Sequence, residues 1–295
     1  MRGCLSKTTD GRILVRPVRG NPQSDFSLEP FCMKALLLAI DIGNTHTVAG
    51  IYAGDRLGDH WRIATGSDAT ADQLAALYSS LLSLRSYELA DVGEMIVSSV
   101  VPPLVGQYER MAALYLKSEA LVVGPGLKTG MPVLTNNPHE VGADRIVNAV
   151  AAIETVGSPC IVVDFGTATT FCAISAAGEY LGGAIAPGVE VSLEALTSRA
   201  ARLSRVDLGE PEAVIGKTTA ASLRSGVVLG FAGLVDGIVK RMQKELGGGR
   251  AGGAATIATG GFSELVVPHA ETLSRVDPLL TLKGLKLVHE RNQRK

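Results

Sequence analysis

The chain is organised around the stretch LLLAIDIGNTHT, residues 36–47. Its first five residues are apolar, and the run then reaches Asp41 and turns at Gly43. A short apolar run that stops at an acid and a glycine is typical of a buried strand that ends in a tight loop. The pattern therefore predicts a strand that delivers polar groups to a loop able to hold a charged ligand.

The same pattern occurs again in CIVVDFGTATT, residues 160–170, and ATIATGG, residues 255–261, gives a possible third loop. In the second copy an apolar run ends in Asp164, one apolar residue, a glycine and several threonines. Glycine-rich loops after strands expose N–H groups to phosphate oxygens, and threonine hydroxyls add donors without adding charge. We expect the two Asp-Gly-Thr loops to face each other across a cleft.

Hydrophobic periodicity around these loops predicts an α/β fold whose second half repeats the first. The expected strands cover 36–40, 48–52, 60–64, 95–100, 121–123, 160–164, 171–174, 180–186 and 255–261. The expected helices cover 72–84, the region through 111 and 114, 141–156 and 219–246. The predicted domains are residues 33–155 and 156–289. Residues 1–32 lack the apolar core of a signal peptide, so we interpret them as a mobile extension or an over-called start, with a functional arm as the alternative.

The helix expected over 219–246 carries a stripe of four glycines, at Gly226, Gly230, Gly233 and Gly237. Each glycine costs about 1 kcal/mol in a helix relative to alanine, so the stripe is expected to permit close approach of another backbone. An interface between subunits or domains is one interpretation, and a bent buried helix is the other. The glycine-rich run over 247–253 predicts a flexible loop after this helix.

Composition excludes several classes of function. The net charge of -1 and the 4% aromatic content offer neither a basic field nor stacking platforms for nucleic acid. The four cysteines form no CxxC pair, which favours buried free thiols in a reducing cytoplasm. The longest apolar segment, 226–235, ends at Asp236 and falls short of the roughly 20 residues that span a bilayer, so no transmembrane helix and no membrane partner are expected.

Together the loops resemble the nucleotide cleft of the actin, Hsp70 and sugar-kinase superfamily. Five motifs in order sharpen this to a resemblance to the type III pantothenate kinase family: LAIDIGNT (38–45), NPHEVGADR (137–145), DFGTATT (164–170), GGAIAPG (182–188) and IGKTT (215–219). The resemblance spans residues 33–288. It implies two duplicated ribonuclease H-like domains with ATP in the cleft between them. It also implies phosphorylation of pantothenate on its primary hydroxyl to 4′-phosphopantothenate, the first step of coenzyme A biosynthesis.

The resemblance further implies roles for individual residues. Asp144 matches the general base of the family. The family's ATP phosphate loop falls on Asp41, Ile42, Gly43, Asn44, Thr45, His46, Thr47 and Val48, and Thr167 matches a further ATP contact. Its pantothenate-binding residues fall on Gly142, Ala143, Asp144, Arg145 and Thr219. Asp41 would hold Mg²⁺ through water, and Asp164 would help bind a monovalent cation, K⁺ or NH₄⁺, near the interface of a homodimer.

The residues themselves leave alternatives open. Asp144 lies in the first turn of its expected helix, where the dipole favours a carboxylate, but it could simply pair with Arg145. Asp164 could be a plain turn acid at the end of a strand. Many family members have a tyrosine that contacts substrate where this chain has Thr135, so either a group from the partner subunit covers pantothenate or the affinity is lower.

Two other functions stay in view. One is a non-catalytic accessory or regulatory protein of transcription, because the family resembles a protein first described in that role. The other is a kinase or phosphatase of the same superfamily with a different substrate. Retention of Asp41, Asp144 and Asp164 argues against a kinase that has lost its activity.

Overall fold

The computed structural model describes residues 4–7, 13–16, 36–200, 206–247 and 253–293, and it divides the chain into two compact units, 1–34 and 35–295. In the first unit, strands β1 (Cys4–Lys7) and β2 (Ile13–Arg16) pair antiparallel. Most of the predicted extension over 1–32 lies outside the described residues, so its mobility stays a prediction. The remaining description concerns the second unit.

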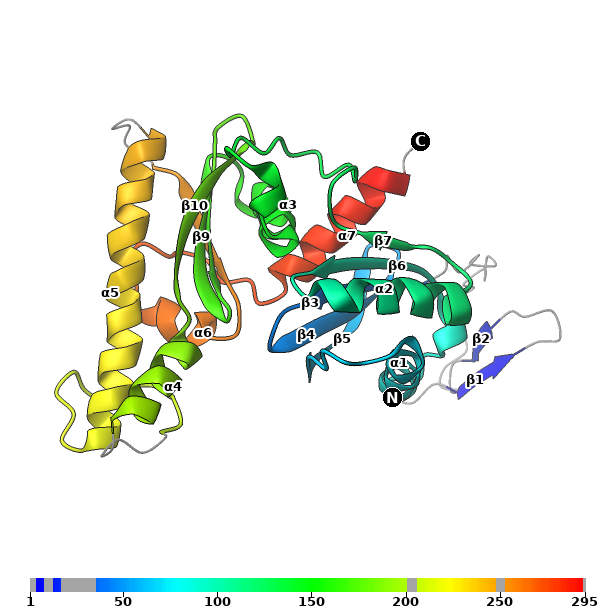
Figure 1. Ribbon diagram of the computed structural model, residues 1–295, viewed down its shortest axis with the longest axis horizontal. Coiled ribbons are helices and arrows are strands. Elements are labelled where there is room, and N and C mark those ends of the chain that lie inside the picture. The colour runs from blue at the N-terminus through cyan, green and yellow to red at the C-terminus, as the bar shows by residue number, and fades with distance from the viewer. Residues whose placement is uncertain (1–3, 8–12, 17–35, 201–205, 248–252, 294–295) are drawn as a thin grey trace, which may run out of the picture. The chain divides into compact units, whose positions relative to one another are not determined.

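The first half of this unit is built on a five-stranded sheet in the order β5-β4-β3-β6-β7 (Figure 1). The strands are β3 (Leu36–Ile42), β4 (His46–Ala53), β5 (Arg56–Ala64), β6 (Val92–Ser99) and β7 (Ala120–Val122). The central strand β3 pairs antiparallel with β4 and parallel with β6. The strand predicted from the opening stretch is thus confirmed, and it lies at the centre of the sheet.

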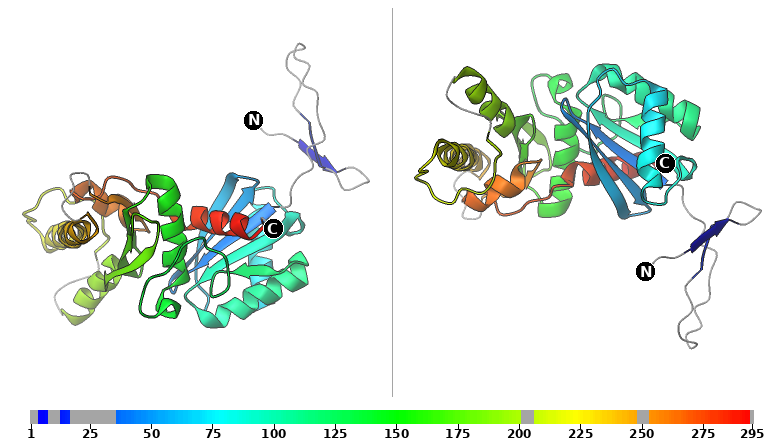
Figure 2. Two further views of the ribbon diagram at one scale, coloured as in Figure 1. Left: turned by 90° about the horizontal axis from the view of Figure 1, so that it is seen from above. Right: turned by 90° about the horizontal axis from the view of Figure 1, so that it is seen from below.

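Helices cover both faces of this sheet, and β3 contributes alternate side chains to each face. Leu36, Leu38 and Ile40 pack with helices α1 (Ala71–Ser83) and α2 (Pro102–Met111). Leu37 and Ala39 pack with helices α3 (Ala143–Val156) and α7 (Leu280–Gln293). Because both faces are buried, β3 reads as a continuous apolar run. In Figure 2, α7 lies against the first sheet and beside α3.

The second half has a four-stranded sheet in the order β10-β9-β8-β11. Its strands are β8 (Cys160–Phe165), β9 (Ala168–Ile174), β10 (Tyr180–Pro187) and β11 (Ala255–Thr259). Like β3, the strand β8 pairs antiparallel with the strand that follows it and parallel with a later one. It also alternates, since Ile161 and Val163 pack with α5 (Thr219–Gly247) while Cys160 and Val162 pack with α3. The predicted duplication is therefore visible in the strand pairing.

The remaining elements are short or lie at the edges. They are α4 (Val189–Arg199), α6 (Ser263–Val266), the 3-10 helices Leu89–Asp91, Pro138–Glu140 and Val267–His269, and the π-helical turn Ala112–Leu116 that extends α2. Helix α1 starts at a cap that the sequence supplies. The Thr70 hydroxyl accepts from Gln73 N and Gln73 Oε1 accepts from Thr70 N, which is a capping box.

Helix α5 differs from expectation in two ways. Within the described chain it is the one helix long and apolar enough to span a membrane by length and composition, which the sequence analysis did not anticipate. Phe231, Val235 and Val239 nevertheless pack into the core of the second half, as in the core helix of a globular protein. The glycine stripe meets no backbone of the described residues, because a Cβ at Gly226, Gly230 or Gly233 would have nothing within 4 Å and one at Gly237 would meet only the Arg241 side chain. Among the described residues the glycine face is therefore exposed rather than buried, and the interface stays a prediction.

The loop after α5 and the boundary between the two domains both stay predictions. The flexible loop predicted over 247–253 lies mostly outside the described residues. The boundary predicted between residues 155 and 156 also stays a prediction, and α7, assigned by it to the second domain, packs against β3 of the first.

Candidate active site

Three carboxylates meet between the two halves. Asp41 lies near the end of β3, Asp164 near the end of β8, and Asp144 in the first turn of α3. Burial, followed by the charges of Asp144 and Asp164, raises the pKa of Asp41 to about 8. Burial and then the charge of Asp144 raise the pKa of Asp164 to about 7. The structure thus gathers three predicted site residues that lie far apart in the sequence.

Asp144 lies directly beside a cation, Arg145, whose charge also acts to lower the pKa of Asp164. Burial raises the pKa of Asp144, while the backbone N–H and the charge of Arg145 act in the opposite direction. Gly142 is the N-cap of α3 and has no side chain to interfere, and a Cβ there would collide with Asp144 Oδ1. The motif residues Gly142, Asp144 and Arg145 therefore form one local unit in which the carboxylate folds back over the glycine.

A buried amide holds Asp164 in place. Asn148 Nδ2, one turn after Asp144 on α3, donates to Asp164 Oδ2 at 3.0 Å. The Thr281 hydroxyl of α7 donates to Asn148 Oδ1 at 2.7 Å, which fixes the orientation of the amide. Asn148 is only 1% exposed, so its amide is shielded from solvent. The spacing of four residues from Asp144 could have indicated Asn148, whereas no local signal points to Thr281.

The third loop supports the same carboxylate from the end of β11. Gly260 has φ +90°, a left-handed conformation that favours glycine, and a Cβ there would lie 2.5 Å from Asp164 Oδ1. The next residue, Gly261, lies against the guanidinium of Arg62, which comes from β5 of the first half. The predicted third loop is thus adjacent to Asp164, and it also reaches the first half of the chain.

The predicted phosphate loop forms the tight turn between β3 and β4. Gly43 N donates to His46 O at 3.0 Å, and a Cβ on Gly43 would lie 2.8 Å from that oxygen. Arg62 Nη2 lies 3.1 Å from His46 Nδ1. Burial, and then the charge of Arg62, lowers the pKa of His46, so the imidazole stays neutral and can accept from the guanidinium. Sequence reasoning missed Arg62, which brings a positive charge to the loop.

The two Asp-Gly-Thr loops lie against each other, and a cleft between them stays a prediction. The hydroxyls of Thr45 in the first loop and Thr167 in the second lie 3.2 Å apart, and both are exposed. Exposed hydroxyls and the backbone N–H groups of two glycine turns can bind the oxygens of a polyphosphate. The arrangement is able to hold an anionic ligand beside a cluster of carboxylates.

Oxygen atoms dominate the side chains around the three carboxylates, which suits hard cations such as Mg²⁺ and K⁺. Ser98, opposite Asp41 on β6, is fully buried and has no hydrogen-bond partner among the described residues, although its hydroxyl is near enough to favour the charged form of Asp41. Within the described residues no three histidine, cysteine, aspartate or glutamate side chains are placed to ligate one metal ion directly. The residues present therefore fit a cation held partly through water or through ligand oxygens.

One predicted substrate contact, Thr219, lies elsewhere. Thr219 is the first residue of α5, just after the N-cap Thr218, whose hydroxyl accepts from Ala221 N. This helix packs on the opposite face of the second sheet from α3, so Thr219 and Asp144 belong to different layers. The hydroxyl of Thr135, at the position that departs from the family, is buried and without a hydrogen-bond partner among the described residues.

Comparison with protein families gives one match over most of the chain. The family model described as type III pantothenate kinase matches residues 37–241. Two curated proteins named type III pantothenate kinase are close in sequence. The one from Moorella thermoacetica is 50% identical over 257 residues, covering 87% of this chain and 100% of that protein. The one from Anaeromyxobacter sp. is 52% identical over 258 residues, covering 88% and 100%.

Solved structures show the same fold at low sequence identity. A conserved putative transcriptional activator of the Baf family from Campylobacter jejuni matches with a TM-score of 0.53 and 18% identity, over 88% of this chain and 100% of that one. A putative 2-dehydro-3-deoxygalactonokinase from Sinorhizobium meliloti matches with a TM-score of 0.52 and 12% identity, over 88% and 100%. At these identities the likeness concerns the α/β fold alone.

Proposed function

This chain belongs to the type III pantothenate kinase family, and from that premise we propose that it transfers the terminal phosphoryl group of ATP to the primary hydroxyl of pantothenate. The product is 4′-phosphopantothenate, and the reaction opens coenzyme A biosynthesis. The observation that carries the proposal is the meeting of Asp41, Asp144 and Asp164 beside two threonine-rich turns. Phosphoryl transfer needs alignment and charge neutralisation more than covalent chemistry, and such a site supplies both.

Asp144 is the proposed general base. It adjoins Arg145, and it lies in the first turn of α3, where the helix dipole favours its ionised form. Burial acts in the opposite direction and raises the pKa of the carboxyl, which brings its basicity closer to neutral pH. In this role Asp144 accepts the proton of the pantothenate hydroxyl as that oxygen attacks the phosphorus. The neighbouring Gly142, Ala143 and Arg145 bind pantothenate.

The turn from Asp41 to Val48 is the proposed ATP phosphate loop, with Thr167 as the donor from the opposite loop. A Mg²⁺ ion bound with ATP would neutralise charge on the phosphates, and Asp41 is the residue proposed to hold it through water. Asp164 is proposed to take part in binding K⁺ or NH₄⁺. A cation near these groups would also offset the mutual repulsion that contributes to their raised pKa values.

The assembly proposed is a homodimer in the cytoplasm, with pantothenate and ATP as the ligands and neither nucleic acid nor a membrane as a partner. The open glycine face of α5 supports the dimer, because nothing within the described chain approaches Gly226, Gly230 or Gly233. Thr219 starts the same helix and is a proposed pantothenate contact. Thr219 and α3 lie in different layers of one subunit. If the second subunit completes the site, Thr219 of one subunit can contact pantothenate bound at α3 of the other.

A coupled assay of ADP formation with ATP and Mg²⁺, with and without pantothenate, tests the proposal. ADP should form only with pantothenate, and K⁺ or NH₄⁺ should raise the rate. Asp144→Asn should lower kcat by about 10² to 10⁴, the usual contribution of a positioned base. Asp72→Asn is the control, since Asp72 accepts from the exposed Tyr115 hydroxyl on the outside of α1.

Three results would contradict the proposal in different ways. Full activity of Asp144→Asn would refute the assignment of the base. Phosphorylation of another alcohol in preference to pantothenate would point to a different kinase of the superfamily. A folded protein that neither binds ATP nor forms ADP would favour the non-catalytic regulator.

A further inference from the structure

One residue outside the motifs supports the phosphate loop at three points. Thr65 follows β5, and its backbone N–H donates to Thr45 O at 3.0 Å. Its hydroxyl donates to Gly43 O at 2.7 Å and lies 2.9 Å from the Thr47 hydroxyl. Thr65 therefore contacts the turn at its first residue, at its tip and at the start of β4.

The proton count of these hydroxyls fixes their direction. A hydroxyl has one proton, and a carbonyl oxygen can only accept, so the Thr65 proton goes to Gly43 O. In the pair with Thr47, Thr65 must then accept and Thr47 must donate. Thr47 is 2% exposed, and its hydroxyl proton points toward Thr65. The Thr45 hydroxyl is exposed and lies beside Thr167 of the second loop. Thr47 is thus engaged inside the protein, and Thr45 is the threonine of this loop that is open to a ligand.

The carbonyl contacts also orient the N–H groups of the turn. In a trans peptide the C=O and the N–H of one unit point in opposite directions. Because Gly43 O and Thr45 O both point to Thr65, the N–H groups of Asn44 and His46 are turned to the opposite side of the loop. Backbone N–H groups on one side of a glycine turn are the donors that phosphate oxygens need.

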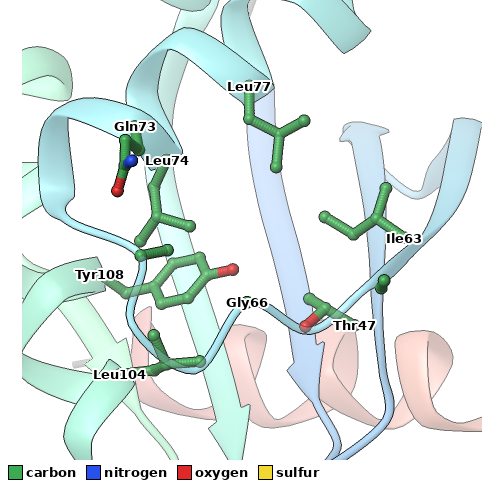
Figure 3. Close-up of a pocket in the computed structure, with 10 residues that line it drawn as sticks. Thr47, Ile63, Gly66, Gln73, Leu74, Leu77, Leu104 and Tyr108 are labelled. Carbon is green, nitrogen blue, oxygen red and sulfur yellow. The ribbon is translucent and has the colours of Figure 1, made fainter.

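The support continues into the helical layer behind the loop. Thr47 lines a cavity of about 140 Å³ between the sheet and α1 and α2, together with Tyr108 (Figure 3). The Tyr108 hydroxyl lies 3.1 Å from that of Tyr78 on α1, and both tyrosines are buried. Thr47 therefore lies between Thr65 and the buried tyrosine pair of the helical layer.

We propose that Thr65 is a positioning residue that holds the phosphate loop in its ATP-binding conformation through its hydroxyl. This inference rests on the proposed assignment of the ATP phosphates to residues 41–48. Thr65 does not touch ATP in this role, and it acts through Gly43, Thr45 and Thr47.

The test compares Thr65→Val, which keeps the shape and loses the hydroxyl, with Thr65→Ser, which keeps the hydroxyl. Titration calorimetry should give a Kd for Mg²⁺–ATP about five- to tenfold higher for Thr65→Val, and the KM for ATP should rise in parallel. The KM for pantothenate should change less than about twofold. Thr65→Ser should restore ATP binding. Thr155→Val is the matched control, because the Thr155 hydroxyl donates to Ala151 O within α3. If Thr65→Val does not fold, Thr65→Ala removes the same hydrogen bonds.

The outcomes separate this inference from the assignment beneath it. Gly43→Ala places a Cβ 2.8 Å from His46 O and should weaken ATP binding if the turn binds phosphate. Normal ATP binding by Gly43→Ala would overturn the loop assignment and this inference with it. Weak binding by Gly43→Ala with normal binding by Thr65→Val would overturn the role of Thr65 alone. Equal impairment of Thr65→Ser and Thr65→Val would also overturn it, because the hydroxyl would then be irrelevant.

Discussion

The Thr45 and Thr167 hydroxyls lie 3.2 Å apart although 122 residues separate them in the sequence. Each belongs to one copy of the Asp-Gly-Thr pattern, so their contact joins the corresponding loops of the two halves. Both threonines are exposed, so a ligand bound at the two loops can reach both hydroxyls.

The threonine pair gives the first prediction. Thr45→Val and Thr167→Val should each raise the KM for ATP about two- to tenfold, because a hydrogen bond contributes about 0.5–1.5 kcal/mol. The double variant should show a smaller effect than the sum of the two free energies, since the residues are in direct contact. Initial rates at varied ATP give the four values, and strict additivity would mean that the pair does not act on a shared ligand.

Gly260 provides a prediction with a matched control. Gly260→Ala should destabilise the protein and lower its activity, because a Cβ would collide with Asp164 and with the backbone of Phe165. Gly54 also has positive φ, at +62°, but a Cβ there meets nothing within 4 Å. Gly54→Ala should therefore cost only the backbone strain of about 1–2 kcal/mol, and Gly260→Ala about 1–3 kcal/mol more. Urea unfolding of both variants measures the difference. Equal decreases in the free energy of unfolding would show that the third loop accommodates the Cβ of residue 260 without a further loss of stability.

The amide network around Asp164 gives a third prediction. Asn148→Ala removes a donor from a buried carboxylate, and a hydrogen bond to a charged group contributes about 1.5–3 kcal/mol, so kcat/KM should fall at least about tenfold. Thr281→Val frees the Asn148 amide to rotate and should act in the same direction with a smaller effect, whereas Thr281→Ser should restore the rate. Steady-state kinetics decide the matter. Wild-type rates for Thr281→Val beside an impaired Asn148→Ala would mean that Thr281 does not orient the amide.

The raised pKa values predict how stability depends on pH without a cation. In the unfolded chain Asp41 has a pKa near 3.8, whereas in the folded protein burial and the nearby carboxylates raise it to about 8. The folded state therefore binds the extra proton between these values, and this stabilisation is complete below pH 4 and is lost as pH rises through 8. Each unit of pKa shift corresponds to about 1.4 kcal/mol.

Replacing the group isolates its contribution. In EDTA, the free energy of unfolding of wild type should decline more steeply between pH 5 and 8 than that of Asp41→Asn, which cannot titrate. Denaturant unfolding at several pH values measures both slopes. Identical slopes for the two proteins would show that Asp41 does not hold a proton in the folded state.

Much of the site could be predicted because its signals are local. The strands that carry Asp41 and Asp164 can be recognised in the sequence by an apolar run before an acid and a glycine. Because this pattern occurs twice, it also predicts that the two loops lie opposite each other. The sequence also predicts that Asp144 lies in the first turn of a helix, because the helical pattern begins close to it. Burial on both faces explains why these strands are continuous in hydrophobicity, and a continuous run is easily found.

The supporting residues could not be predicted because their partners are distant in the sequence. Thr65 and Thr281 lie in segments without a motif, and only the folded chain brings them to Gly43 and Asn148. The glycines of α5 were interpreted as contacts with another backbone, but spacing along a helix does not say what faces it. In the described chain that face is open, and the packing of the opposite face on the second sheet accounts for the hydrophobicity of the helix.

Helix α7 has a consequence for how the protein is made. Its residues Leu282 and Leu285 share a core with Leu37 and Ala39 of β3, the strand translated first among those of the second unit. While the ribosome is still synthesising the intervening chain, one face of the first sheet lacks its cover. The nascent first half must then wait with exposed apolar surface until translation reaches α7, a stage at which we expect it to bind chaperones.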